Sequence, residues 1–159
     1  MSSVVEVRRA RTGDVRGIRA LVAPLARNRI LLNKEAVTYY EALQQFWVAV
    51  ASGDAGGVVA GGASGGSGGA GEVVGCAALH VIWEDLAEIR TLAVSPEYRR
   101  RGVGDQLLDS LVSDARALGV ERLFCLTFET EFFGRHGFSP IDGQAVTPEV
   151  YAELLRSYD

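Results

Sequence analysis

The stretch from Leu86 to Leu108 constrains the fold more than any other part of this chain. It begins as an apolar, β-type run that closes at Pro96, passes through Arg99 to Arg101, and reaches Gly102 and Gly104, where a helical pattern starts. A strand that turns through glycine into a helix is typical of an α/β architecture. The first N–H groups of a helix lack internal partners and lie at the positive end of its dipole, so this turn is predicted to bind an anion such as a phosphate.

Two familiar phosphate-binding loops do not fit this turn. A P-loop needs Gly-Lys-Ser/Thr, which is absent, and the dinucleotide fingerprint needs a third glycine where Leu107 stands. The pattern that does fit is Arg/Gln-x-x-Gly-x-Gly/Ala, present as Arg99-x-x-Gly102-x-Gly104. It is the acyl-CoA-binding signature of the GNAT superfamily of N-acetyltransferases, which the chain resembles over most of its length. The segment Phe132 to Phe138, which resembles the short helix ending in Gly-Phe of that superfamily, supports the assignment.

The resemblance implies acetyl-CoA as co-substrate and no metal. Backbone N–H groups from Arg101 to Gln106 would hold the pyrophosphate, while backbone groups of Leu92 and Val94 would bind the pantetheine arm and polarise the thioester carbonyl. The implied cofactor-binding residues are Leu92, Ala93, Val94, Arg99, Arg100, Arg101, Gly102, Val103, Gly104, Asp105 and Gln106.

Two segments, Ala87 to Val94 and Leu126 to Phe138, resemble short stand-alone N-acetylglutamate synthases. The implied reaction moves acetyl from acetyl-CoA to the α-amine of glutamate by direct attack in a ternary complex, the first step of arginine biosynthesis. The segment Ile30 to Lys34 resembles the stretch that lines the amino-acid pocket in those enzymes, which makes Leu31 and Lys34 candidate substrate-binding residues. Glutamine, another small amine or a protein N-terminus remains an alternative acceptor, and a non-catalytic, CoA-binding regulatory module remains an alternative function.

The chemistry requires a base, because an α-ammonium group must lose a proton before it attacks a thioester. Glu88 is the predicted base, and Glu84 and Asp85 are fallback candidates for which an ordinary acidic turn is the favoured interpretation. Strict alternation along a strand from Leu86 to Val94 places Glu88 and Arg90 on the same face as Leu92 and Val94. The same alternation also fits an exposed Glu88–Arg90 ion pair, which would contribute less than about 1 kcal/mol to stability. The glutamate that the resembling synthases carry at this position favours the base.

The general acid and the carboxylate-binding groups are less clearly marked. Phe133 stands where many superfamily members have a tyrosine, and it cannot donate a proton. Thr130 is the candidate acid, with the alternative that it caps the short helix. Substrate carboxylates call for a cation, so Lys34, Arg90 and Arg29 are candidate substrate-binding residues. Their alternatives are a solvated first helical turn for Lys34, a loop for Arg29 and the pair with Glu88 for Arg90.

Hydrophobic periodicity divides the rest of the chain into helices and strands. The glycine-rich segment 53–71 holds ten of the nineteen glycines and is predicted to be a flexible loop. The expected elements, in order, are a strand Val4–Arg8, a helix Val15–Leu25 capped at Thr12, a helix Lys34–Ala51, strands Glu72–Trp83 and Leu86–Val94 joined by an acidic turn at Glu84 and Asp85, a helix Val103–Leu118, a strand Arg122–Phe128, a short helix Glu131–His136 and a last helix Pro148–Tyr158. Hairpins and crossovers together indicate a single α/β domain with a mixed sheet. The resemblance to the GNAT superfamily implies that this sheet is mostly antiparallel and flanked by helices.

Composition limits the alternatives. The 159 residues fit a single domain, 1–159. A net charge of −4 argues against nucleic-acid binding, and no apolar run is long enough to span a membrane. Cys76 and Cys125 lack CxxC spacing, which indicates no zinc site and a reduced, cytoplasmic compartment. Cys125 is expected to be an unreactive filler, and His80 and His136 are expected to be structural.

Two further expectations rest on the family alone. The related synthases continue into a strand after the final helix, and that strand is expected to be absent here because the sequence stops at Asp159. A possible homodimer follows only by analogy with the family.

Overall fold

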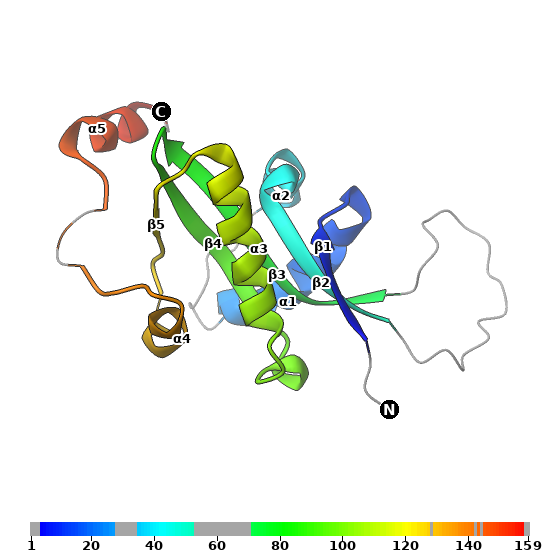
Figure 1. Cartoon of the computed structure of the whole chain (residues 1–159). Helices are drawn as coiled ribbons and strands as arrows, with labels where there is room; N and C mark the ends of the chain where they lie inside the picture. The colour runs from blue at the N-terminus through cyan, green and yellow to red at the C-terminus, as the bar shows by residue number, and fades with distance from the viewer. Residues whose placement is uncertain are drawn as a thin grey trace, which may run out of the picture.

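The computed structural model describes residues 4–27, 35–52, 71–127, 129–141, 143 and 145–157. Leu31, Lys34 and most of the glycine-rich segment lie outside them. Within these residues one sheet has the strand order β1-β2-β3-β4-β5, and helices cover both of its faces (Figure 1). The elements are β1 (Val5–Arg9), α1 (Val15–Arg27), α2 (Ala36–Glu41), β2 (Phe46–Ser52), β3 (Gly71–Trp83), β4 (Leu86–Val94), α3 (Val103–Leu118), β5 (Arg122–Phe124), α4 (Thr130–Arg135) and α5 (Pro148–Ser157), with 3-10 turns η1 (Thr12–Asp14), η2 (Leu43–Gln45) and η3 (Pro96–Tyr98).

The sheet is mixed and mostly antiparallel, which confirms the predicted fold class. Strands β1 to β4 pair antiparallel in sequence order, and β5 adds to β4 in parallel after the crossover through α3. The β3–β4 hairpin turns at Glu84 and Asp85, as expected. No described helix is long and apolar enough to cross a bilayer.

Each face of the sheet has its own core. On one face α3 buries Leu107, Leu108 and Leu111 against β3 and β4. On the other face α1 buries Val15 and Ile18 against residues of β2 and β3, and α2 adds Tyr39. The sheet is therefore apolar on both sides, and a polar side chain on it stands out.

The predicted helix Lys34–Ala51 is wrong in its second half. Only Ala36–Glu41 is α-helical, and the chain is extended from Phe46 onward as β2. The apolar spacing of Tyr40, Leu43, Phe46 and Val50 imitates a helical stripe. It actually joins a short helix to a strand that is covered on both faces, whose buried and half-buried residues follow one another without polar alternation.

The predicted strand Arg122–Phe128 is too long. Its described strand ends at Phe124, residues 125–127 have no regular structure, and Phe128 lies outside the described residues. Strand pairing ends there too, because β5 pairs only with Leu86 to Glu88 at the beginning of β4.

A β-bulge in β4 corrects a second expectation. Cys76 pairs with Ala93 and Ala78 with Arg90, so Thr91 and Leu92 together stand opposite Ala77. Thr91 has a φ of 54°, a left-handed conformation that disrupts the alternation.

The bulge reverses the faces of the side chains that follow it. Ala87 and Ile89 belong to the α3-side core, and Leu92 and Val94 pack against the same core, while Ala93 lies in the α1-side core. Glu88 alternates with its neighbours Ala87 and Ile89 and therefore faces the α1 side. Strict alternation predicted that Glu88 and Arg90 share a face with Leu92 and Val94. This prediction is wrong, because the bulge places the two pairs on opposite faces.

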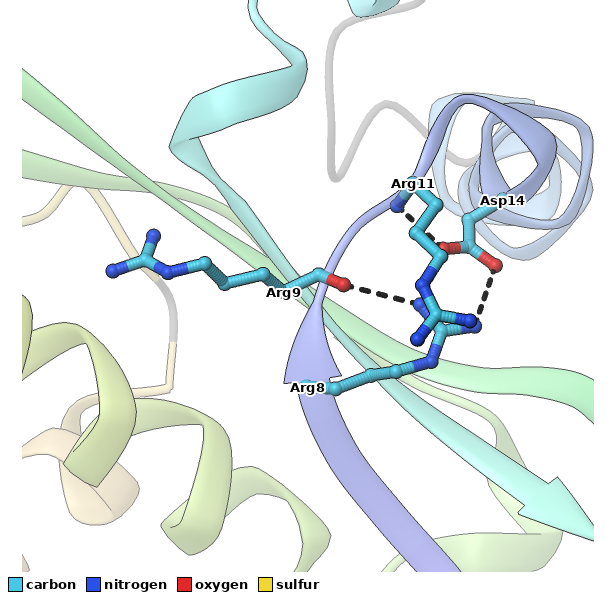
Figure 2. A network of polar contacts seen from close by, with 4 residues as sticks. All are labelled: Arg8, Arg9, Arg11 and Asp14. Atoms are coloured by element: carbon cyan, nitrogen blue, oxygen red, sulfur yellow. Dashed lines mark hydrogen bonds and ion pairs between the residues drawn. The ribbon is translucent and has the colours of Figure 1, made fainter.

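Partly buried polar contacts fix the corner between β1 and α1 (Figure 2). Arg8 donates two hydrogen bonds to the carboxylate of Asp14, at 2.7 and 3.0 Å. The backbone N–H of Arg11 donates to the same carboxylate at 2.7 Å. Arg11, not Thr12, holds the N-cap position of the first turn, so the expected Thr12 cap is wrong. The carboxylate of Asp14 accepts the N–H of the N-cap residue itself, which is the reverse of the bond expected from a Thr12 cap.

Candidate active site

The glycine turn between β4 and α3 has the geometry of an anion cradle. Gly102, with a φ of 79°, is the N-cap residue, and α3 begins at Val103. Such a φ favours glycine, because a side chain is strained there. Gln106 donates its N–H to the Gly102 carbonyl at 3.0 Å, the first bond of the helix. The N–H groups of Val103, Gly104 and Asp105 therefore have no acceptor inside the helix.

Glycine at 104 lets α3 and α4 approach each other. A Cβ atom at this position would come within 3.2 Å of the Phe132 ring. The space between the first turn of α3 and α4 is therefore small, and a side chain at residue 104 would press against the Phe132 ring.

Three exposed arginines form the rim of the cradle. The Arg99 Nε donates to the Val94 carbonyl at 3.3 Å, and the Arg101 guanidinium lies over the Tyr98 ring at 5.1 Å. Arg100 has a φ of 63°. No ion pair to any of the three is found among the described residues. A chain with net charge −4 thus presents local positive charge beside unpaired helix N–H groups.

The second half of β4 has one edge without a strand beside it in the part of the chain that the structure describes. β5 pairs with Leu86, Ala87 and Glu88 only, whereas β4 continues to Val94. Backbone polar groups along such an edge can bind an extended ligand in the manner of an added strand. Leu92, Ala93 and Val94 lie on this stretch, which leads directly into the cradle.

Glu88 is the buried charged residue of the described core, with 8% of its surface exposed. The Arg90 Nε donates a short hydrogen bond to the Glu88 Oε1. His80 stands directly opposite Glu88 on β3, and its Nδ1 lies 3.2 Å from the Gln45 side-chain oxygen. The pair is not the exposed surface ion pair that the sequence allowed as an alternative. Its carboxylate lies in an otherwise apolar sheet, where one guanidinium compensates part of the desolvation cost.

Cys125 follows β5 and is close enough to Glu88 to be influenced by it. Burial, with a smaller contribution from the negative charge of Glu88, raises the pKa of the Cys125 thiol to about 11. The thiol is protonated at neutral pH, so it cannot act as a nucleophile there. This agrees with the expectation that Cys125 is unreactive.

The described contacts give Thr130 no capping role. It is the first residue of α4 and is exposed, and the N-cap position belongs to Glu129. The hydroxyl that stabilises the start of α4 is that of Thr127, which accepts the Glu129 N–H at 2.8 Å. Phe133 is buried in the α3-side core and makes edge contacts with Phe132 and Phe138.

A contact that the sequence did not reveal joins α4 to the cradle. The His136 Nε2 lies 2.6 Å from the Asp105 Oδ1, within the first turn of α3. Thirty-one positions separate the two residues, and no local pattern links them. Only the tertiary packing of α4 against α3 brings them together.

Comparisons with known proteins agree on one family. Residues 27–138 match the acetyltransferase (GNAT) family. An amino-acid acetyltransferase of Mycobacterium tuberculosis is 50% identical over 96% of this chain and 79% of its own length. An amino-acid acetyltransferase of Pseudomonas fluorescens is 35% identical over 84% of this chain, which spans only 27% of that protein.

Solved structures show the same likeness. The M. tuberculosis protein Rv2747, in complex with CoA and NLQ, superposes with a TM-score of 0.78 at 49% identity, over 97% of this chain and 83% of that one. The N-acetylglutamate synthase of Neisseria gonorrhoeae, in complex with coenzyme A and N-acetyl-glutamate, has a TM-score of 0.75 at 31% identity. This likeness covers 99% of the present chain and 33% of the synthase.

Proposed function

We propose a function for this chain on one premise: it belongs to the acetyltransferase (GNAT) family. It is therefore an acyltransferase that uses acetyl-CoA as co-substrate, and its relatives identify it as an amino-acid acetyltransferase. The finer proposal is that the acceptor is the α-amine of glutamate, as in N-acetylglutamate synthase. Support comes from the likeness to the N. gonorrhoeae synthase, whose complex contains N-acetyl-glutamate.

The cradle fits the pyrophosphate of acetyl-CoA. The N–H groups of Val103, Gly104 and Asp105 would donate to it, and Arg99, Arg100 and Arg101 would supply positive charge at the rim. The pantetheine arm would extend along Leu92, Ala93 and Val94 on the edge of β4 that β5 leaves unpaired. Backbone N–H groups on that edge would stabilise the negative charge that develops on the thioester oxygen.

Glu88 is the observation that carries the proposed reaction. It faces the α1 side of the sheet, toward α1 and α2, the helices on either side of the predicted acceptor segment Ile30–Lys34. The Glu88 carboxylate would take a proton from the α-ammonium group, directly or through one water, and the hydrogen bond from Arg90 would orient that carboxylate. The free amine then attacks the thioester carbonyl carbon, the C–S bond breaks, and the leaving thiolate takes a proton from water or from Thr130.

The acceptor assay measures free-thiol release from acetyl-CoA with glutamate, glutamine and a panel of other amines offered separately. We expect release with glutamate above all others. Release only with another amine would refute glutamate as the substrate, while the absence of release with any amine, despite CoA binding by calorimetry, would favour the regulatory-module alternative.

The variant assay addresses the base. Glu88→Gln is expected to lower kcat by at least about a hundredfold, because positioned general bases contribute that much, while acetyl-CoA still binds. Glu84→Gln is the matched control, since it changes an exposed carboxylate in the nearby hairpin turn and should leave kcat within about twofold. An unchanged kcat for Glu88→Gln would remove Glu88 as the base.

The cellular role follows from the proposed acceptor. We place the reaction in the cytoplasm, at the first step of arginine biosynthesis. Restored growth of an arginine auxotroph that lacks its N-acetylglutamate synthase tests this role, and a solution mass measurement tests the possible homodimer.

A further inference from the structure

Asp105 occupies a helix position at which an acidic side chain often accepts a hydrogen bond from a backbone N–H at the start of the same helix. It is the third residue of α3 after the N-cap Gly102. In a capping box, a side chain at this position reaches back to the N-cap backbone N–H. Such a carboxylate would occupy the Gly102 N–H and would bring a negative charge beside the free N–H groups of the first turn, which an anionic ligand needs.

In this structure the carboxylate bonds elsewhere. The Asp105 Oδ1 lies 2.6 Å from the His136 Nε2, and no hydrogen bond from the Gly102 N–H to Asp105 is found among the described residues. A hydrogen bond between an imidazole and a carboxylate is among the stronger protein contacts, so it can compete with the helix start for this side chain.

The His136 ring is held in place by the helix that carries it. Its backbone N–H donates to the Phe133 carbonyl at 3.0 Å, and its ring lies 5.1 Å from the ring of Phe132. The Phe132 ring in turn lies so near α3 that a Cβ on Gly104 would come within 3.2 Å of it. The packing of α4 against the first turn of α3 therefore sets where the imidazole can meet Asp105.

We propose that His136 is a positioning residue for coenzyme A: by binding the Asp105 carboxylate, it keeps that carboxylate off the N–H groups at the start of α3, which then receive the diphosphate. The charge argument points the same way, because a carboxylate within the cradle repels a diphosphate unless a donor orients and partly neutralises it. The inference rests on the proposed CoA site but not on the identity of the acceptor.

A double-mutant cycle on CoA binding, measured by calorimetry with the full chain, tests the proposal. His136→Ala releases Asp105 to the helix start and is expected to raise the Kd for CoA about tenfold. Asp105→Asn removes the competing charge and is expected to lower the Kd about two- to threefold. The double variant is expected to bind CoA within about twofold of Asp105→Asn, because His136 has no carboxylate left to hold.

A purely structural role for His136 gives a different pattern. The double variant would then bind as weakly as His136→Ala, and Asp105→Asn alone would weaken binding because it loses the same tie; either result overturns the proposal. Should His136→Ala not fold, His136→Gln keeps an N–H donor and is expected to bind CoA within about threefold of the wild type. A folded His136→Gln protein with a tenfold loss would also overturn the proposal. Arg116→Gln is the control, since it removes an exposed cation at the opposite end of α3 and should leave the Kd for CoA within about twofold.

The second readout separates the diphosphate from the rest of the substrate. Acetyl-pantetheine carries the thioester without the diphosphate, so His136→Ala is expected to lower the ratio of kcat/KM for acetyl-CoA to kcat/KM for acetyl-pantetheine about tenfold. An unchanged ratio overturns the role of His136. If the wild-type protein does not bind CoA at all, the CoA site itself fails, whereas binding that does not depend on His136 refutes only this inference.

Discussion

Glu88, with 8% of its surface exposed, accepts a hydrogen bond from Arg90 and lies opposite His80 on β3, so residues of two strands form its surroundings. Its position on a strand followed from the apolar run Leu86 to Val94, and its predicted role followed from a resemblance. Its face relative to Leu92 and Val94 depends on the bulge at Thr91, and no local sequence pattern predicts a threonine with positive φ. The two histidine contacts, with Gln45 and with Asp105, likewise depend on packing between distant segments.

The raised pKa of the Cys125 thiol predicts that this residue reacts slowly with alkylating agents in the folded protein. With a pKa of about 11, the thiol is ionised in only about one molecule in a thousand at pH 8, and the reactive thiolate prevails only above the pKa. Alkylation of Cys125 by iodoacetamide in the folded protein at pH 8 should therefore be about a hundredfold slower than that of the same cysteine in urea. Mass spectrometry of the modified peptide measures both rates. Rapid, complete alkylation of the native protein would contradict the high pKa.

Among the helices and strands, the prediction is correct where the hydrophobic periodicity and the residues at both ends indicate the same element. Helix α3 was predicted from its apolar face and the glycines at both ends, and it spans Val103–Leu118 as expected. The prediction from hydrophobic spacing is wrong at β2, because the apolar residues of this strand continue the spacing of the helix before it. A strand covered on both faces has no polar alternation that would distinguish it from a buried helix.

The corner between β1 and α1 gives a stability prediction. Burial alone would raise the pKa of Asp14, but hydrogen bonds from Arg8 and from the Arg11 N–H outweigh it and lower the pKa below its usual value. A carboxyl whose folded pKa is lowered stabilises the fold above the unfolded-state pKa, near 3.8, and loses that effect as the pH falls through the folded value. Asp14→Asn is therefore expected to lower the free energy of unfolding by about 1–2 kcal/mol at pH 7.

Urea titrations at several pH values provide the measurement. The difference between wild type and Asp14→Asn should be constant from pH 7 to pH 5 and should shrink below pH 4. A difference that persists undiminished at pH 2 would show that the ion pair is not its source.

Across the whole molecule, the sheet separates the proposed CoA-binding groups from the proposed base. The cradle and the unpaired edge of β4 lie beside α3, whereas Glu88 and Arg90 face α1 and α2. The bulge brings about this division, because it sends the side chains before and after Thr91 to opposite faces. One strand can therefore offer its backbone to a thioester and its carboxylate to an amine.

This division predicts the kinetic mechanism. Both substrates can be present at once, and the one described cysteine near Glu88 has a protonated thiol, so the acetyl group should pass directly from acetyl-CoA to the amine with no acetylated enzyme between. Initial rates measured at several concentrations of both substrates should give intersecting lines in a double-reciprocal plot. Incubation with acetyl-CoA alone should leave the protein mass unchanged. Parallel lines together with a stoichiometric acetyl adduct would instead require a nucleophile on the enzyme, and the side chain that carries the adduct would replace Glu88 as the centre of the reaction.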